Sequence, residues 1–305
     1  MNPTSIKSKY GIDAESVISL RSNVAIIETH AAGKAIFKKA RKSSSNNQIN
    51  NHRFKNEMRI YRALQNASFK YLNTPKLIDA GDSHMVIQFV EKQPDSHVDV
   101  GEFVRAYLEL QSLDVEPDLW FDFKNQIVRG FGYKGTIIPI FTLSKIIGIS
   151  KALKVVSLFL KLTVQAPKLK HRYWLHGDLT KHNVYHNNDG QLFFIDFENL
   201  SYTRKWPLAE VIQRCIWLKD GGYGLRIDLK MLKKYFAEAC PAVKHDLQKI
   251  NIKTQFRFSL LMQCIQNIAI AKSKVKRESY QLFLDDILNN EKFDNWYNIN
   301  INPLI

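Results

Sequence analysis

Cysteine is scarce in this chain of 305 residues, and the three that occur, Cys215, Cys240 and Cys264, lie far apart. No Cys-x-x-Cys pair exists, so the sequence offers neither a zinc site with the usual ligand spacing nor a disulfide framework. We therefore expect three buried free thiols in a reducing compartment, the cytoplasm.

Long apolar runs are also absent. No window of ~18 uncharged apolar residues occurs, which is the length that a membrane-spanning helix requires. The segment from Met1 to Lys7 contains no apolar stretch of the kind found in secretory signals, so a signal peptide is not expected. The hydrophobic content of 45%, with 11% aromatic residues, is nevertheless typical of a globular protein. The length fits one two-lobed unit or two modest domains.

Acidic residues are missing from one long stretch, because residues 123–177 contain no Asp or Glu. The formal net charge of the whole chain is +15, a surplus that concerns partners rather than fold. In the helix predicted around residues 142–165, Lys151, Lys154 and Lys161 fall within about 100° of one another, as does Lys168 if the helix persists that far. A solvated basic face on a core helix is the simpler interpretation. The functional alternative is contact with an anionic partner, either a phosphorylated glycan or acidic lipid headgroups on the inner face of the membrane. Nucleic acid is not expected, because no known binding module accompanies the charge.

Alternating apolar segments dominate the beginning of the chain. The elements predicted from them are strands at residues 16–20, 24–28, 34–38, 74–81 and 84–90, a helix at 53–64, and a polar flexible loop at 41–52. After a linker at residues 93–100 the pattern becomes helical. Helices are predicted at 101–113, around 142–165, and at 207–218, 228–239, 254–272 and 277–290. The sequence therefore predicts an α+β protein, with a small antiparallel-sheet lobe over residues 1–91 and a larger helical lobe over residues 92–305 that holds the acceptor site.

Three polar side chains with suggestive spacing stand out between residues 174 and 198. Asp178 and Asn183 lie five apart in a polar turn, and Asp196 ends the apolar run that follows. An Asn-Asn-Asp-Gly turn at residues 187–190 predicts a hairpin between them. Two carboxylates and an amide suit phosphoryl transfer: Asp178 is the predicted catalytic base, while Asn183 and Asp196 are catalytic as ligands of Mg²⁺. The alternative for Asp178 alone is a turn residue that caps its own backbone. His176 is expected to be structural.

Phosphoryl transfer also requires a cation on the phosphates, and the third predicted strand carries Lys38 and Lys39. Because side chains alternate along a strand, only one of them can face the nucleotide. We favour Lys38, with Glu57 on the following helix as the carboxylate that positions it. Solvent exposure of Glu57 is the alternative.

No Gly-x-Gly-x-x-Gly loop occurs within the predicted sheet lobe, residues 1–91. The turn between the first two strands contains Ser22 and Asn23, which we expect to contact the phosphates through backbone N–H groups and a hydroxyl. Residues 88–91, which include Gln88 and Val90, are expected to offer backbone groups to the adenine.

Residues 176–183 (His-Gly-Asp-Leu-Thr-Lys-His-Asn) and 195–198 (Ile-Asp-Phe-Glu) resemble the catalytic signatures of the aminoglycoside phosphotransferase and choline kinase-like superfamily. Eukaryotic protein kinases favour His-Arg-Asp and Asp-Phe-Gly instead. Residues 22–23 resemble the short nucleotide loop of the superfamily, and residues 74–81 resemble the segment before its hinge. The motif is also similar to that of bacterial lipopolysaccharide sugar kinases, such as those acting on Kdo.

The resemblance covers residues 16–215 and implies a protein kinase-like fold, ATP as donor and Mg²⁺. It also implies that Asp178 is the base, that Asn183 and Asp196 hold the metal, and that Lys38 and Glu57 form the phosphate-clamping pair. Two features depart from related patterns. No Ala-Pro-Glu segment follows, which argues against peptide docking, and residues 207–209 are Pro-Leu-Ala where the superfamily often has Asp-Leu-Ala.

The sequence thus predicts an ATP- and Mg²⁺-dependent phosphotransferase acting on a hydroxyl of a small molecule or glycan. Among acceptors, we favour a lipopolysaccharide or capsule sugar of the cell envelope. This preference comes from the basic stretch, whose residues Lys151, Lys154 and Lys161 are the expected contact with an anionic membrane. The alternatives are an aminoglycoside-type antibiotic phosphotransferase, a catalytically silent kinase-like binding protein, and a protein kinase.

Overall fold

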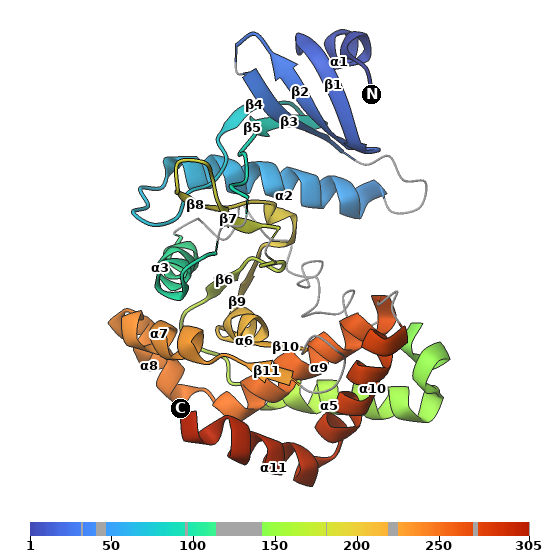
Figure 1. Cartoon of the computed structure of the whole chain (residues 1–305), viewed down its shortest axis with the longest axis vertical. Helices are drawn as coiled ribbons and strands as arrows, with labels where there is room; N and C mark the ends of the chain where they lie inside the picture. Colours follow the sequence, from blue (N-terminus) through green and yellow to red (C-terminus); the bar gives the residue numbers. More distant parts are fainter. Residues whose placement is uncertain are drawn as a thin grey trace. The chain divides into compact units, whose positions relative to one another are not determined.

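The computed structural model describes residues 1–31, 33–40, 47–94, 97–113, 142–180, 182–218, 225–270 and 274–304. The chain divides into two compact units, and each is described by itself. Unit 1 comprises Met1–Asn125 and Thr180–Leu200, and unit 2 comprises Gln126–Leu179 and Ser201–Ile305. Figure 1 labels the helices and strands of both units. The boundary predicted between residues 91 and 92 lies within unit 1, and the division into two lobes at that point remains a prediction.

Unit 1 begins with a short helix followed by an antiparallel sheet of five strands in the order β1-β2-β3-β5-β4. The elements are α1 (Pro3–Tyr10), β1 (Ala14–Arg21), β2 (Val24–Thr29), β3 (Gly33–Lys39), β4 (Leu77–Ala80) and β5 (His84–Gln88). The predicted antiparallel sheet is therefore confirmed. Helix α1 was not predicted; it begins with Asn2 as its N-cap and Pro3 in the first turn, and it ends at Gly11 in the left-handed conformation.

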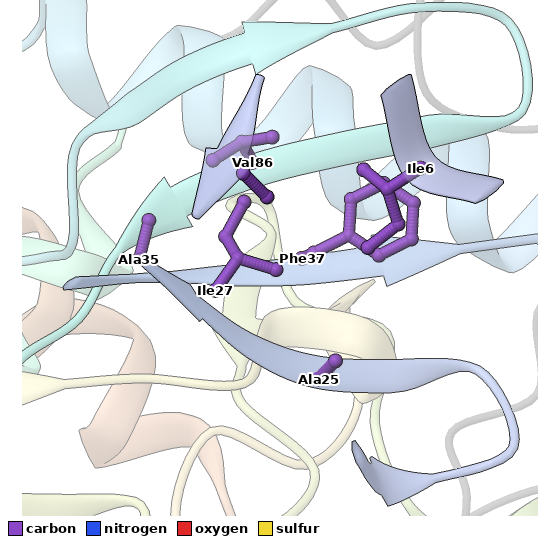
Figure 2. Close-up of a cluster of buried hydrophobic side chains, with 7 residues drawn as sticks. Ile6, Ala25, Ile27, Ala35, Phe37 and Val86 are labelled. Atoms are coloured by element: carbon purple, nitrogen blue, oxygen red, sulfur yellow. The ribbon is translucent and has the colours of Figure 1, made fainter. Parts of the chain in front are cut away.

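The core of this sheet lies on the face that α1 covers. Figure 2 shows the buried cluster, which consists of Ile6, Ala14, Ala25, Ile27, Ala35, Phe37 and Val86. The ring of His84 lies on the same face, because its centroid is 6.1 Å from that of Phe37 and 5.1 Å from that of Tyr10. Lys39 is the cross-strand partner of His84 and shares its face. Lys38, one residue earlier, points to the opposite face.

Helix α2 (Asn47–Asn66) carries the carboxylate expected to meet that lysine. Its predicted apolar stripe is buried, with Phe54, Met58 and Tyr61 at most 8% exposed. Glu57 lies beside these side chains and is itself only 3% exposed. The helix begins at Asn47, so the prediction of a loop through residue 52 is wrong for residues 47–52, while residues 41–46 lie outside the described residues. Eight consecutive residues without Gly or Pro, 47–54, allow the helix to extend backwards.

The predicted hairpin is present in unit 1, formed by β7 (Val184–His186) and β8 (Leu192–Phe194) around the turn at residues 187–190. The segment after α2 fixes its position: the Asn73 N–H donates to the Leu192 carbonyl at 3.3 Å, and the Phe194 N–H donates to the Asn73 carbonyl at 2.9 Å. Helix α3 (Val100–Gln111) packs against it through Phe103, whose ring stacks on Phe194 at 5.7 Å. A 3-10 turn, η2 (Phe197–Asn199), follows the hairpin and contacts α2.

Unit 2 is mainly helical. Its elements are α5 (Ile149–Gln165), β6 (Tyr173–Leu175), β9 (Ser201–Thr203), α6 (Ala209–Cys215), β10 (Ile216–Leu218), β11 (Leu225–Ile227), α7 (Lys230–Glu238), α8 (Pro241–Lys249), α9 (Ile252–Ile270), α10 (Lys274–Leu288), α11 (Asn290–Asn300) and η3 (Asn302–Leu304). Helix α9 contacts α5, α6 and α10 and is buried over most of its surface, as its many large apolar residues require. The predicted α+β class, with a helical part after the sheet, is confirmed.

Several predicted helix boundaries in unit 2 are wrong. The helical stretch around residues 142–165 breaks at Gly148, whose φ of 82° is accessible mainly to glycine. Residues 216–218 form β10 rather than the end of a helix, because Ile-Trp-Leu pairs with β11. Two helices, α8 and α11, were not predicted; α8 begins with Pro241 at its first position, which is a helix-start signal.

Two of the three cysteines, Cys215 and Cys264, are buried free thiols as expected, whereas Cys240 is exposed at the start of α8. Among the described helices, none combines the length and the apolar character that crossing a bilayer demands.

A buried carboxylate supports the segment that leads into β6. Asp246 of α8 is fully buried, and its Oδ2 accepts hydrogen bonds from the His171 backbone N–H at 3.1 Å and from the Tyr173 hydroxyl at 3.1 Å. The His171 ring nitrogen Nδ1 lies 3.0 Å from the same oxygen. Burial by itself raises the pKa of Asp246, but these donors lower it below its ordinary value. The ionised carboxylate therefore stabilises unit 2.

Asp246→Asn is expected to lower the free energy of unfolding at neutral pH by about 2 kcal/mol, because it weakens hydrogen bonds to a charged acceptor. A lowered carboxyl pKa stabilises the fold above the ordinary value of ~4, and this contribution is lost as the pH falls through the lowered value. The difference between the wild type and Asp246→Asn in thermal melts should therefore narrow below about pH 4. Asp286→Asn serves as the control, because the Asp286 side chain is 45% exposed and its ion pair with Lys292 is long, at 3.6 Å. A difference that stays constant with pH would contradict the ionised state of Asp246.

Candidate active site

Lys38 and Glu57 form a buried ion pair in unit 1. The Lys38 Nζ lies 2.7 Å from Glu57 Oε1, and the two side chains are 14% and 3% exposed. Strand β3 directs Lys38 away from the α1 face, and α2 presents Glu57 among its buried residues. The structure thus brings together the lysine and the carboxylate that the sequence pairs, and it places Lys39 on the other face of the sheet.

The same ammonium reaches a second carboxylate, since the Lys38 Nζ lies 3.0 Å from Asp196 Oδ1. Asp196 follows β8 and has φ 62° and ψ 65°, the left-handed conformation. Among the described residues, it is the only non-glycine residue with positive φ. That conformation costs about 1–2 kcal/mol for an L-residue, and the surrounding contacts must supply it. One of them comes from the Asp196 N–H, which donates to the Tyr61 hydroxyl at 3.4 Å.

Asn183 and Asp196 lie at the open end of the same hairpin. The Ile195 N–H donates to the Asn183 carbonyl at 2.9 Å, one step beyond the pair of Val184 with Phe194. The Asn183 N–H in turn donates to the Thr180 carbonyl at 3.0 Å, which closes the turn before β7. The Asn183 residue is 8% exposed. Their predicted proximity thus follows directly from strand pairing.

The electrostatics of the cluster favour a charged lysine. Burial lowers the pKa of Lys38, but the nearby carboxylates of Glu57 and Asp196 raise it above its ordinary value. Burial raises the pKa of Glu57 to about 7, although the ammonium in direct contact opposes this shift. The pKa of the Tyr61 hydroxyl is also raised, mainly by burial and then by Glu57. Tyr61 therefore stays protonated and neutral beside the ion pair.

The donor set fits a hard divalent cation. One carboxylate oxygen from each of Glu57, Asp196 and Glu198 lies within 4.8 Å of the others. The Asp196 side chain is 34% exposed and Glu57 only 3%, so a ligand can reach Asp196 while Glu57 is committed to the lysine. Mg²⁺ prefers such oxygen ligands and usually takes one or two from protein. Asp196, Asn183 and Glu198 are the residues that would hold it. Glu198 was not assigned a metal role from the sequence.

The nucleotide-contact residues predicted from the sequence lie at the ends of sheet strands. Ser22 and Asn23 form the tight turn between β1 and β2, and the Lys39 N–H ties this turn to β3 by donating to the Asn23 carbonyl at 2.9 Å. The Gln88 N–H is already used by the Lys76 carbonyl at 2.8 Å. The Val90 carbonyl accepts from the Tyr185 hydroxyl at 3.0 Å. Contacts of these residues with a nucleotide remain predictions.

Asp178 belongs to unit 2, in the loop that follows β6. His176 is fully buried, and Gly177 has φ 82°. The carboxylate of Glu210, on α6, accepts hydrogen bonds from both backbone N–H groups: His176 donates to Oε2 at 2.8 Å, and Gly177 donates to Oε1. The catalytic role of Asp178 remains a prediction, but its loop has a defined support.

Helix α6 supports this loop from a second residue as well. The Arg214 Nη1 donates to the Leu179 carbonyl at 2.7 Å. Burial lowers the pKa of Arg214, while the nearby Glu210 carboxylate opposes that shift. Neither Glu210 nor Arg214 was selected from the sequence. The only signal in the sequence was the Pro-Leu-Ala of residues 207–209, where Asp-Leu-Ala is expected. Glu210, three residues after the missing Asp, is buried.

No family model matches the sequence, and no curated protein matches it either. Solved structures do match. A gentamicin complex of APH(2")-IIa is 13% identical with a TM-score of 0.58, and the match covers 95% of this chain and 96% of that one. The ADP-bound aminoglycoside phosphotransferase APH(2'')-Ib is 13% identical with a TM-score of 0.55, covering 95% and 97%. A protein of Haemophilus somnus 129PT provisionally named fructosamine-3-kinase is 12% identical with a TM-score of 0.57, covering 94% and 96%.

At this level of identity the likeness establishes the fold and leaves the activity to be argued from the residues. The similarity to Kdo-type kinases remains a prediction from the sequence. The five-stranded antiparallel sheet followed by a mainly helical region is the protein kinase-like fold seen in aminoglycoside phosphotransferases, and this chain has that fold.

Proposed function

We propose that the protein is an ATP- and Mg²⁺-dependent phosphotransferase that acts on a hydroxyl group of a small molecule. The observation that carries the proposal is the Lys38 ammonium, held 2.7 Å from Glu57 and 3.0 Å from Asp196. The buried Lys38 ammonium next to the partly exposed Asp196 carboxylate suits a triphosphate and its metal. Asn183, on the paired strand end, adds an amide oxygen. Nothing in a merely structural ion pair requires Asp196 to adopt a left-handed backbone.

Each residue has a distinct role in this proposal. Bound Mg²⁺-ATP supplies the phosphoryl group, with the metal neutralising charge on the phosphates. Lys38 contacts phosphate oxygens, and Glu57 positions Lys38. Asp196 and Asn183 offer oxygen ligands to the metal. Asp178 orients the acceptor hydroxyl and accepts its proton, for which an ionised carboxylate at neutral pH is suited.

The acceptor class can be narrowed by two observations that point in different directions. The fold matches include proteins named for aminoglycosides and, provisionally, for a fructosamine, which supports an amino sugar or similar polyol over an envelope glycan. The net charge of +15 disfavours a polycationic antibiotic, because like charges repel during encounter. A neutral or weakly charged sugar derivative satisfies both. Phosphate transfer from ATP to a panel of aminoglycosides, fructosamines, neutral sugars and Kdo separates these acceptors, and transfer only to Kdo would favour the envelope-sugar alternative.

Binding of Mg²⁺-ATP is the first experimental test. The wild type is expected to melt at a higher temperature with Mg²⁺-ATP, since a ligand at a hundredfold its Kd stabilises by about 2.7 kcal/mol. Asp196→Asn should lose most of this stabilisation while keeping the fold, because asparagine tolerates the left-handed conformation. Asp189→Asn, in the exposed turn of the same hairpin, is the matched control. No stabilisation of the wild type would favour the silent binding protein.

A further inference from the structure

We propose that α5 forms a surface that binds an anionic lipid bilayer, a property separate from phosphoryl transfer. The helix carries four large apolar side chains that face solvent: Ile149, Leu153, Leu160 and Val164 are 72%, 63%, 56% and 83% exposed. Their spacing of four, seven and four residues places them within about 60° of one another on a helix of 3.6 residues per turn. They are therefore aligned in one stripe along the helix.

The opposite side of α5 accounts for its place in the fold. Ala152, Val155, Leu158 and Leu162 are buried, and the helix packs on α9 through this side. The exposed stripe therefore takes no part in the core of unit 2. Scattered exposed apolar residues are ordinary, whereas four aligned on one helix point to an interaction surface.

Two lysines lie along one edge of the stripe. Lys154 and Lys161 lie between the exposed stripe and the buried side, about 60–80° beyond Val164 on the helix. Both are exposed, and neither makes an ion pair with any residue that the structure describes. Lys151, which the sequence grouped with them, instead pairs with Asp285 of α10 at 2.5 Å, so its charge is compensated within the protein. The basic surface is therefore defined by a smaller set than the sequence suggested.

More positive charge gathers at the end of the same helix. The Lys205 Nζ donates to the Thr163 carbonyl at 2.7 Å, which fixes it against the last turns of α5. Lys168 is exposed. Burial lowers the pKa of Lys205, and the nearby positive charge of Lys168 lowers it further. Two like charges held near each other favour an anionic partner, because an anion relieves their repulsion.

The combination identifies the partner as a bilayer rather than as another anion. Nucleic acid would use the lysines but leave the apolar stripe exposed, and an apolar protein surface would cover the stripe but gain nothing from the lysines. A helix with an apolar stripe edged by lysines lies in the plane of a membrane interface, with the apolar side chains among the acyl chains and the ammonium groups at the lipid phosphates.

Sedimentation of the full-length protein with vesicles tests the proposal. Binding is expected to vesicles containing phosphatidylglycerol, to be weak with phosphatidylcholine alone, and to fall as salt rises. The double variants Lys154→Glu/Lys161→Glu and Leu153→Ser/Leu160→Ser should each lose at least tenfold in apparent affinity. A basic residue near an anionic surface contributes on the order of fivefold, and charge reversal costs more.

Matched controls use exposed positions on other elements. Lys55→Glu/Lys244→Glu changes the net charge equally, and Leu282→Ser/Ile299→Ser removes equally exposed apolar side chains from α10 and α11. The proposal would be overturned by equal losses in the controls, by equal binding to neutral vesicles, or by no binding at all. It would also be overturned if the protein self-associates through the stripe and Leu153→Ser/Leu160→Ser abolishes that self-association. Because vesicle binding needs neither ATP nor turnover, its failure is distinguishable from a failure of the proposed phosphotransferase activity.

Discussion

Asp178→Asn is expected to reduce kcat by a factor of about 10²–10⁴, the usual contribution of a positioned acid or base. The amide keeps the shape of the carboxylate but cannot accept the proton of the acceptor hydroxyl. The measurement is ATP turnover with the best acceptor from the panel, together with the Kd for Mg²⁺-ATP from thermal shifts. We expect that Kd to stay within a few-fold of the wild type, because the proposed phosphate and metal ligands are Lys38, Asn183 and Asp196.

The combination of the two readouts separates a catalytic from a structural role. An asparagine that merely disturbed the loop would lower the melting temperature as well as kcat, whereas loss of a base lowers kcat alone. Asp189→Asn, an exposed aspartate of the β7–β8 turn, should leave both quantities unchanged. If Asp178→Asn retained full turnover, Asp178 could not be the base, and the capping alternative for this residue would be favoured.

The sequence predicted the parts of this site that depend on strand periodicity and turn chemistry. The Asn-Asn-Asp-Gly turn fixes the register of β7 with β8, and that register alone places Asn183 opposite Ile195, beside Asp196. Alternation along β3 likewise separates Lys38 from Lys39, but alternation cannot say which face is covered. That choice is made by α1, whose Ile6 packs into the sheet core, and α1 was not predicted.

The parts that escaped prediction depend on long-range packing. Glu210 lies on a helix of seven residues and would ordinarily be expected in solvent, yet it is 3% exposed. The exposed face of α5 could not be predicted for the same reason. The helix has apolar residues all round, and only its packing on α9 decides which of them remain exposed. Lys151 shows the same limit, because its partner Asp285 is distant in sequence. Periodicity identifies faces, and tertiary contacts choose among them.

Glu210→Ala is expected to lower the free energy of unfolding by roughly 3–5 kcal/mol and to reduce kcat strongly. The substitution leaves the N–H groups of His176 and Gly177 without their acceptor, and a buried donor left unsatisfied costs about 1–3 kcal/mol. It also removes a negative charge that opposes the effect of burial on Arg214. Chemical denaturation measures the first effect, and turnover at a temperature where the variant is folded measures the second.

Glu210→Gln keeps the side-chain volume and one oxygen acceptor, so it distinguishes positioning from simple stability. Its amide N–H₂ must face one of the two loop donors, which should displace the loop before Asp178 without unfolding unit 2. We therefore expect a lower kcat with an unchanged Kd for Mg²⁺-ATP, and the exposed Glu291→Gln of α11 should alter neither. A Glu210→Gln enzyme that is less stable but turns over like the wild type would reduce Glu210 to a structural residue. If instead kcat falls alone, the Glu210 carboxylate takes the place of the aspartate missing at residue 207, three residues earlier. The altered Pro-Leu-Ala segment is then compatible with an active enzyme.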